Sequence, residues 1–333
     1  MPRVPIQILQ DEYYRVLLPT GLPPERAALV AQRLAENQRD GIYSHGLQRF
    51  PAFYASIAAN GIDVRATPEK VGGVGAIEQW DGRMGLGVWN AHFGMGRAIE
   101  LARSHGLGCV ALRNTNHWMR AGSYALQATE AGCIGICWTN TIPLLPPWGS
   151  AEVRIGNNPL AIALPPAETP MLLDMAMSQY ANGKLEVYRN RGEALPIAGG
   201  YGADGMLTRD PAAILAARRA VPMGYWKGSA LAVMLDTLAA LLSGGLASHQ
   251  IAGQGTERRV SQVFIAIDGQ PLADAGAWSA TVKAIVHDLQ QAAPLVEGDP
   301  VRYPGERMRQ TREESLRSGV VVDEKQWAAL RAM

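Results

Sequence analysis

The chain has 333 residues, 47% of them hydrophobic and 18% charged, which is enough apolar material for one or two domains with a sizeable core. The formal net charge is +1 and no dense run of Lys and Arg occurs, so a nucleic-acid partner and an anionic membrane surface are both disfavoured. The N-terminal stretch lacks the apolar core of a signal peptide, and the most apolar stretch, 229 to 242, is too short to span a bilayer. We therefore expect a cytoplasmic protein.

The first sixty residues are predicted to be mainly helical. Pro23 and Pro24 open an apolar pattern with helical spacing that ends by Gly41. A second helical stripe runs through residues 47 to 57 and ends near Asn60 and Gly61.

Helices and short strands alternate in the middle of the chain. Helical patterns cover 94–105, 122–132 and 227–245, and strand-like runs cover 109–113, 133–138, 160–164, 171–173 and 263–267. This alternation predicts a mixed α/β fold, with the apolar helix at 227–245 inside it. From residue 278 onward the pattern is helical and more charged again. We therefore expect a helical domain built from both termini, 1–68 together with 278–333, and an α/β domain at 69–277.

Several common site motifs do not occur in this sequence. The three cysteines, Cys109, Cys133 and Cys137, are an odd count and are read as small buried residues of strands and not as disulfide partners. The six histidines lack metal-binding spacing, so no metal is expected. The glycines at 72–75 lack the dinucleotide-binding spacing of a Rossmann fold and are interpreted as a turn.

The stretch YSHGLQRF, residues 43 to 50, combines two residues suited to acid chemistry. If Ser44 is a helix N-cap, His45 and Arg49 lie one turn apart on the same face, although Pro51 limits how far that helix is regular. A histidine can give a proton to a developing alkoxide, and an arginine can hold a carboxylate at two points. Together they suit reduction of a 2-oxo acid. The plain alternative is a helix start with a solvated arginine.

Two further clusters have both a functional and a structural interpretation. In residues 114 to 124, His117, Trp118 and Arg120 follow a strand and precede a helix, where they could contact a polyol or an acid or simply order a loop. In residues 222 to 228, Trp226 and Lys227 stand at a helix start, which suits either phosphate binding or plain capping. Trp118, Trp148 and Trp226 are candidates for pocket walls or for core packing.

Taken together, these motifs resemble the malate/L-lactate dehydrogenase superfamily, whose members lack a Rossmann fold. The resemblance rests on SHGLQRFP at 44–51, GAIEQWD at 75–81, ALRNTNHWMR at 111–120, GICWTN at 135–140, PPWG at 146–149, PMGYWKGS at 222–229 and SQVFIAI at 261–267. These stretches run through nearly the whole chain. Within the superfamily, the likeness is greatest to the branch that reduces 2,3-diketo-L-gulonate.

The resemblance implies roles for particular residues. His45 would be the proton donor, Ser44 and Arg49 would bind or orient the substrate, and His117 would lie in a second substrate-facing loop. The implied cofactor residues are Pro170, Met171, Leu172, Leu173, Asp174, Met175, Ala176, Trp226, Lys227, Gly305, Glu306 and Arg307. The resemblance also implies a homodimer that binds NAD or NADP in a mixed α/β domain of its own type, which agrees with the missing fingerprint.

The activity expected from this resemblance is NAD(P)H-dependent reduction of the C2 carbonyl of a 2-oxo sugar acid, foremost 2,3-diketo-L-gulonate to 3-dehydro-L-gulonate. One alternative is a reductase of another 2-oxo acid, such as a malate, L-lactate or ureidoglycolate dehydrogenase. A more distant alternative is a non-catalytic sugar-acid binding protein. A small-molecule substrate is expected in the first two cases.

Overall fold

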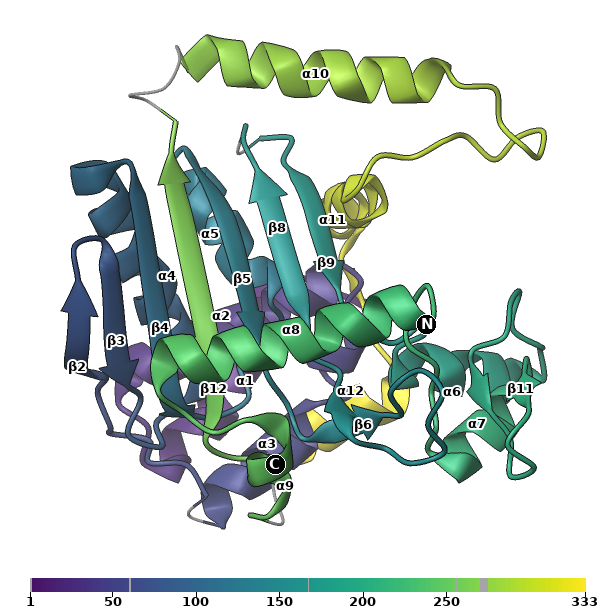
Figure 1. Cartoon of the computed structure of the whole chain (residues 1–333), viewed down its shortest axis with the longest axis horizontal. Coiled ribbons are helices and arrows are strands. Elements are labelled where there is room, and N and C mark those ends of the chain that lie inside the picture. The colour runs from purple at the N-terminus through teal and green to yellow at the C-terminus, as the bar shows by residue number, and fades with distance from the viewer. Residues whose placement is uncertain (1, 60, 167, 255–256, 270–274) are drawn as a thin grey trace.

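The computed structural model describes residues 2–59, 61–166, 168–254, 257–269 and 275–333 (Figure 1). The helices are α1 (Ile6–Leu17), α2 (Pro24–Arg39), α3 (Phe50–Ala58), α4 (Gly87–His105), α5 (Gly122–Glu130), α6 (Asn182–Arg191), α7 (Pro211–Ala217), α8 (Trp226–Ser243), α9 (Ser248–Ala252), α10 (Ala275–Gln291), α11 (Glu306–Ser318) and α12 (Glu324–Ala332), with short 3-10 turns η1 (Leu18–Thr20) and η2 (Tyr43–His45). The strands are β1 (Arg3–Val4), β2 (Glu69–Val74), β3 (Ile77–Asp81), β4 (Leu107–Thr115), β5 (Cys133–Thr139), β6 (Pro143–Leu145), β7 (Ile155–Gly156), β8 (Leu160–Leu164), β9 (Met171–Met175), β10 (Gly200–Tyr201), β11 (Leu207–Thr208), β12 (Val260–Asp268) and β13 (Val320–Val321). The predicted mixed α/β class is confirmed.

One mixed sheet forms the centre of the molecule. In the described part of the chain it has seven strands in the order β2-β3-β4-β12-β5-β8-β9. Only the β3–β4 pair is parallel, and the other neighbouring pairs are antiparallel. Strand β12, from late in the chain, is inserted between β4 and β5 and is buried along most of its length, as its near-continuous apolar sequence suggests.

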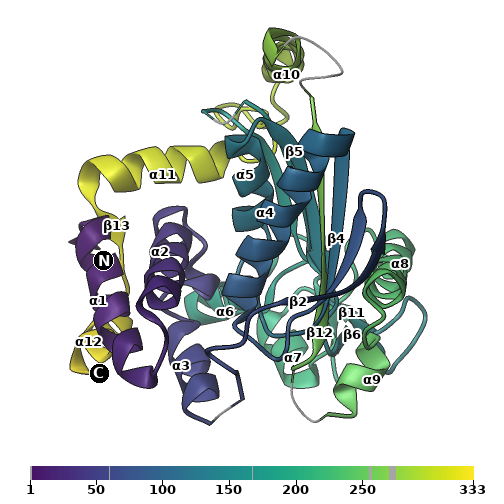
Figure 2. The same cartoon turned by 90° about the vertical axis from the view of Figure 1, so that its left-hand side faces the viewer.

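Helices cover the two faces of this sheet unequally (Figure 2). Helices α4 and α5 pack on one face, where a cluster that includes Met95, Leu112, Tyr124 and Phe264 is buried. Helix α8 crosses the other face. Only one side of this apolar helix packs on the sheet, because Val233, Met234 and Leu241 on the other side are between 45% and 71% exposed. The helix packs on the sheet of the α/β fold, as predicted, and its outer face is exposed.

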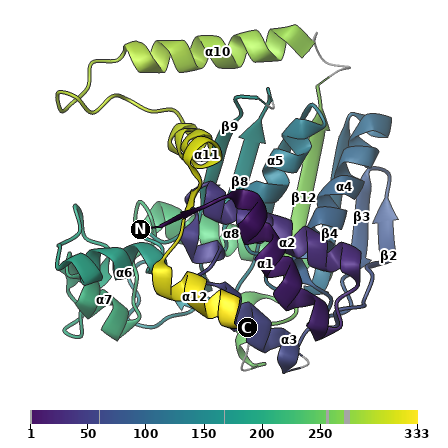
Figure 3. The same cartoon turned by 180° about the vertical axis from the view of Figure 1, so that it is seen from behind.

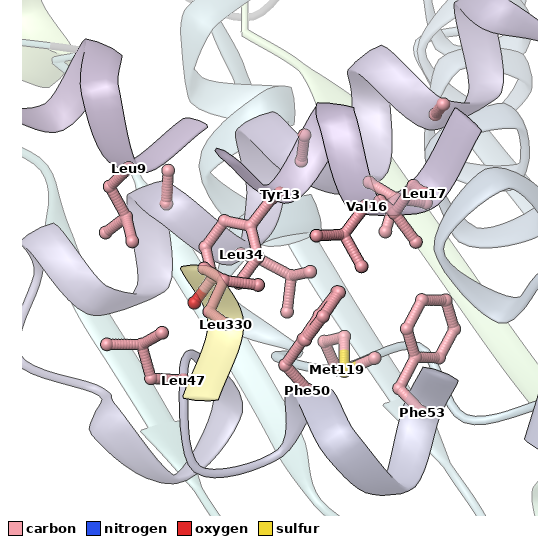
Figure 4. Close-up of a cluster of buried hydrophobic side chains, with 14 of the residues drawn as sticks. Leu9, Tyr13, Val16, Leu17, Leu34, Leu47, Phe50, Phe53, Met119 and Leu330 are labelled. Carbon is pink, nitrogen blue, oxygen red and sulfur yellow. The ribbon is translucent and has the colours of Figure 1, made fainter. Parts of the chain in front are cut away.

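The two ends of the chain pack together beside α4 and α5 (Figure 3). Strand β1 pairs with β13, α1 contacts both α2 and α12, and α11 contacts α2. Figure 4 shows the core of this layer, in which Tyr13, Phe50 and Leu330 come from distant parts of the sequence. Met119, from the loop after β4, is buried in the same core. This side chain fastens that loop to the terminal helices.

Helix α10 lies beyond one end of the sheet in the three overall views (Figures 1, 2 and 3), and its Gln290 donates to Glu306 of α11 at 3.3 Å. Its apolar residues Trp278, Val282, Ile285, Val286 and Leu289 recur at helical spacing, which makes one apolar stripe. Ile285 and Leu289 on this stripe are exposed.

The glycine-rich segment 72–75 ends in a turn, as predicted, but its first residues belong to a strand. Residues up to Val74 form β2, which pairs with β3 in an antiparallel hairpin, and the turn lies at Gly75 and Ala76. Gly75 has a φ of +56° in that turn, a conformation that glycine adopts without a steric penalty. The prediction is therefore confirmed for Gly75, whereas Gly72 and Gly73 lie in β2.

Candidate active site

The SHG motif does not open a regular helix, contrary to the sequence prediction. Ser44 and His45 belong to the short 3-10 turn η2, which ends at Gly46, and α3 begins only at Phe50. Pro51 occupies the first turn of α3, where a missing N–H costs no hydrogen bond. Arg49 precedes that helix, so it and His45 are joined by a turn and are not stacked on one helical face.

His45 lies in a tightly defined setting despite its irregular backbone. The Ser44 hydroxyl lies 3.1 Å from the His45 Nδ1. The Asn37 side chain donates to the His45 carbonyl at 3.1 Å, and Ser123, in the first turn of α5, donates to Asn37 at 3.3 Å. Ser44 is thus a partner of the histidine and not the predicted helix cap.

Burial and nearby charges change the acidity of His45. The pKa of His45 is lowered to about 4, chiefly by burial; the negative charge of Asp174 opposes this shift, and the positive charges of Arg49 and Arg120 add to it. These three charges come from three different parts of the chain.

His117 lies beside His45, as the sequence suggested for a second substrate-facing loop. The two imidazole rings are nearly parallel, with centroids 5.8 Å apart. The Met119 N–H donates to the His117 Nδ1 at 3.0 Å, so the proton of the neutral ring is on Nε2. Burial and the charges of Arg49 and His45 hold the pKa of His117 well below its usual value. A neutral His117 therefore offers an N–H donor next to His45.

The two residues that follow His117 anchor the loop. Trp118 is 2% exposed and packs against Tyr124 and Phe264 in the core beneath α4 and α5. It is a core residue and not a pocket wall. Trp148 and Trp226, the other two tryptophans considered, are 44% and 61% exposed.

Arg120 takes part in buried ion pairs, where the sequence suggested a contact with a polyol or an acid. Its Nε donates to Asp174 at 2.8 Å and its Nη1 donates to Asp40 at 2.9 Å. Asp40 also accepts from Arg39 and Arg312. These arginines hold the pKa of the buried Asp40 carboxyl well below its usual value. Sequence reasoning missed Asp40 because nothing near it in the chain marks its partners.

A further acidic residue that the sequence did not single out lies near Arg49. Glu257 belongs to the segment between α9 and β12. Burial raises the pKa of the Glu257 carboxyl, and the charge of Arg49 opposes that rise. Arg49 and Glu257 are far apart in the sequence, so no local spacing reveals that their charges interact.

Two of the three predicted cofactor segments meet at the start of β9. The Leu172 N–H donates to the Pro304 carbonyl at 2.9 Å, and a Cβ on Gly305 would lie 3.0 Å from the Leu172 nitrogen. The stretch from Pro170 to Ala176 is thus in contact with the first turn of α11, which holds Gly305, Glu306 and Arg307. In that turn Glu306 is buried, and its Oε2 has no hydrogen-bond partner among the described residues.

The third predicted segment lies beyond the other end of β9. The Met223 N–H donates to the Met177 carbonyl at 2.8 Å, which places the turn before α8 beside the end of the β9 segment. Trp226 and Lys227 begin α8, and the Lys227 ammonium lies 5.9 Å from the centre of the Trp226 ring. The three segments are therefore arranged along one strand.

The described part of the chain contains neither a metal-binding cluster nor a membrane-spanning helix. Among the residues whose positions are described, no group of three or more His, Cys, Asp or Glu side chains could hold a metal ion. None of the helices in that part of the chain combines the length and the apolar character needed to cross a membrane.

Comparison with known proteins identifies the family. The model of the malate/L-lactate dehydrogenase family matches residues 4–331. A 2,3-diketo-L-gulonate reductase from Citrobacter koseri is 44% identical over 332 residues, which cover 99% of this chain and 100% of that protein.

Solved structures agree over the same length. A malate dehydrogenase from Entamoeba histolytica superposes with a TM-score of 0.92 at 27% identity, covering 99% of this chain and 96% of that one. A sulfolactate dehydrogenase from Methanocaldococcus jannaschii gives a TM-score of 0.90 at 28% identity, with coverage of 99% and 96%. The family predicted from the sequence motifs is confirmed. The chain belongs to the malate/L-lactate dehydrogenase family.

Proposed function

We propose that this protein is an NAD(P)H-dependent oxidoreductase that reduces the C2 carbonyl of a 2-oxo sugar acid, with 2,3-diketo-L-gulonate as substrate and 3-dehydro-L-gulonate as product. The observation that carries the proposal is the grouping of His45, His117 and Arg49. The two imidazole rings are nearly parallel, with centroids 5.8 Å apart, and the charge of Arg49 lowers the pKa of both histidines. The full-length likeness to 2,3-diketo-L-gulonate reductases supports this substrate over smaller acids.

Each residue of this group has a separate task in the proposed reaction. Arg49 holds the C1 carboxylate of the substrate through its guanidinium fork. His45 in its protonated form gives its proton to the alkoxide oxygen that forms on C2 as the carbonyl is reduced. His117 stays neutral and donates from Nε2 to a substrate oxygen, a role that its fixed tautomer permits. Ser44, hydrogen-bonded to the His45 ring, keeps that ring in orientation.

The cofactor supplies the hydride that reaches C2. Pro170 to Ala176, Trp226 and Lys227, and Gly305 to Arg307 would hold it along β9. Glu306 fits this role, because a buried carboxylate oxygen without a partner suits a hydroxyl donor such as those of a ribose. The same carboxylate would repel a 2′-phosphate. We therefore propose NADH as the preferred cofactor, with NADPH a weaker one.

We further propose that the protein acts as a homodimer in the cytoplasm. The support for a dimer is unpartnered apolar surface on two helices. Ile285 and Leu289 are exposed on α10, and Met234 and Leu241 are exposed on α8. Exposed apolar stripes of this kind mark contact surfaces in soluble proteins. The occupant that we propose is a second copy of the chain.

A panel of oxo acids tests the reaction and the cofactor together. The purified protein is given 2,3-diketo-L-gulonate, oxaloacetate, pyruvate and sulfopyruvate, each with NADH and with NADPH, and loss of absorbance at the reduced nicotinamide is followed. We expect the diketo sugar acid with NADH to give the highest kcat/KM. Higher kcat/KM for a small acid would move the protein to another branch of the family. Binding of the sugar acid without consumption of either cofactor would instead indicate a binding protein.

A further inference from the structure

Arg120 is a buried arginine that the proposed reaction does not use directly. Its side chain is 3% exposed. The guanidinium bridges two carboxylates, Asp174 on β9 and Asp40 at the end of α2, and its Nη2 lies 3.0 Å from the Met308 sulfur on α11. Burial of a charge is costly unless the charge is paired. The Arg120 guanidinium is therefore held in one position, where it reaches both carboxylates.

The Asp174 carboxylate is held from two sides. Its Oδ2 accepts from the Arg120 Nε at 2.8 Å. The same Oδ2 lies against the first turn of α5, where a Cβ on Gly122 would come within 2.4 Å of it. Only a glycine leaves room for this approach. Asp174 is therefore fixed through one oxygen by the arginine and by the helix start.

The first turn of α5 also reaches His45. Ser123, the residue after Gly122, donates to Asn37, and Asn37 donates to the His45 carbonyl. In the same helical turn, Gly122 thus lies against the Asp174 carboxylate, and Ser123 hydrogen-bonds to Asn37, which holds the His45 carbonyl. The charged and titratable groups that act on His45 are Asp174 from β9, Arg49 from the turn before α3, and Arg120 and His117 from the loop before α5.

Asp40 keeps Arg120 in place from the opposite side. The Asp40 side chain is 1% exposed and is paired with Arg39, Arg120 and Arg312. Arg312 lies on α11, 272 residues away in the sequence. Three elements therefore fix this carboxylate, which makes it a rigid anchor for the guanidinium.

We propose that Arg120, anchored by Asp40, is a positioning residue that holds the Asp174 carboxylate where its negative charge acts on His45. The inference deepens the proposed function, because it takes His45 as the proton donor. Arg120 makes no contact with substrate in this scheme. It sets the charge that the proton donor experiences, through the place that it gives to Asp174.

Titration of His45 tests this directly. The holoprotein without substrate is labelled with 15N-histidine, and the His45 ring signals are followed between pH 3.5 and 8 in the parent and in Arg120→Lys, Asp174→Asn and the double variant. Lysine keeps the charge but loses the fork that bridges two carboxylates. We expect the His45 ring to be about half protonated at pH 4 in the parent and only about one-tenth protonated at that pH in each single variant, a fall of roughly one pH unit, since a fixed opposite charge is lost.

The double variant separates positioning from simple support of the fold. If Arg120 acts through Asp174, adding Asp174→Asn to Arg120→Lys produces little further shift, so the two effects are strongly non-additive. Additive shifts, or an unchanged midpoint in Arg120→Lys, would overturn the proposal. Asp40→Asn removes the anchor and carries the same expectation as Arg120→Lys, which keeps the test decisive if the lysine variant does not fold.

A matched control is available in a separate network. Arg97 on α4 forms a comparable pair with the buried Glu78 on β3. Arg97→Lys should lower thermal stability without moving the His45 midpoint. In the activity assay, Arg120→Lys should reduce kcat at least tenfold. If the oxo-acid panel shows no turnover, the proposed function fails, while the titration still decides the role of Arg120.

Discussion

At the scale of single residues, the proposed proton donor, His45, lies in an environment that opposes its protonation. Its burial and the charge of Arg49 both lower the pKa of the imidazole, and Asp174 alone among its charged neighbours raises it. A bound carboxylate would neutralise Arg49 and so remove one of the opposing charges. Protonation of the donor is thereby linked to capture of the acid that receives the proton.

Replacement of His45 tests its role in turnover. His45→Ala should lower kcat for oxo-acid reduction by about 10² to 10⁴, the range typical of a lost general acid, because the group that protonates the oxygen on C2 is removed. The affinity for NADH, measured by fluorescence titration, should change little. His105→Ala, at the exposed end of α4, is the control and should keep the parent kcat. Turnover at the parent rate in His45→Ala would place the acid elsewhere.

The linkage between Arg49 and His45 predicts a difference between two pH profiles. The reduction needs protonated His45, so its rate falls as pH rises through the pKa of that group. The profile of kcat/KM reports the free enzyme, in which the pKa of His45 is about 4. The profile of kcat reports the bound enzyme, in which the neutralised Arg49 no longer lowers it. We therefore expect the kcat profile to break at a higher pH than the kcat/KM profile.

Arg49→Gln is the comparison variant for this prediction. It should raise the KM for the oxo acid and bring the two apparent pKa values together, because no arginine charge is left for the substrate to neutralise. Steady-state rates between pH 4 and 9 measure both effects. A separation of the two pKa values that persists in Arg49→Gln would contradict the linkage.

At the scale of elements, the loop between β4 and α5 joins the two cores to the site. Trp118 is buried beneath α4 and α5, whereas Met119 is buried among the terminal helices. His117 and Arg120 flank these two anchors, so both polar side chains are placed by the packing of their apolar neighbours. The start of α4 packs against this loop, with Gly87 next to the Asn116 and His117 carbonyls.

Two glycines of α4 provide a matched pair for testing this contact. A Cβ at Gly87 would lie 2.1 Å from the Asn116 carbonyl oxygen, so Gly87→Ala must displace the loop that carries His117. A Cβ at Gly96 would meet only the end of the Gln127 side chain, at 3.6 Å. We expect Gly96→Ala to stabilise the protein by about 0.5–1 kcal/mol through helix propensity. Gly87→Ala should lower both the melting temperature and kcat.

Thermal unfolding and oxo-acid turnover measure the outcome of this pair. Similar melting temperatures and rates in the two variants would mean that the loop adapts without moving His117. The comparison is informative because both substitutions add the same methyl group to the same helix.

At the scale of the whole molecule, the site lies where the terminal helices meet the central sheet. His45 and Arg49 follow α2, whereas His117 and Asp174 belong to the sheet and its loops. We keep the division into a helical domain, 1–68 with 278–333, and an α/β domain, 69–277, as a proposal. Helix α10 contacts α11 through the Gln290–Glu306 hydrogen bond, and we propose that its exposed apolar stripe meets a second copy of the chain.

The proposed dimer predicts a role for the apolar stripe of α10. Ile285→Asp should place a charge on that stripe and convert the dimer to a monomer, because burying an unpaired carboxylate is unfavourable. Lys283→Glu alters the charge of an exposed position beside the stripe and should leave the dimer intact. Sedimentation equilibrium gives the mass in each case. A parent protein that sediments as a monomer would refute the dimer, and a dimeric Ile285→Asp variant would move the interface elsewhere.

Local sequence signals were enough to predict most elements. The periodic pattern, with Pro23 as the cap and Pro24 as the first residue of α2, placed that helix correctly, and the run at 160–164 is strand β8 itself. Alternation also placed Cys133 and Cys137 together on the buried face of β5. Such signals succeed because helix and strand periods reflect contacts between near neighbours. The same signals misjudged the SHG segment, since Ser44 resembles a cap while Gly46 and Pro51 together delay the helix to Phe50.

The sequence by itself determined the mixed α/β class, the family and the motif that holds His45 and Arg49. Only the tertiary structure decided which charges act on His45. One ion-pair network joins residues that are far apart in the chain: Asp40, Arg120, Asp174 and Arg312. They meet because the end of α2, the loop before α5, β9 and α11 lie next to one another in the fold. Electrostatic interactions depend on distance in space and on burial. The acidity of the proposed donor is therefore a property of the folded molecule and cannot be read from its local sequence.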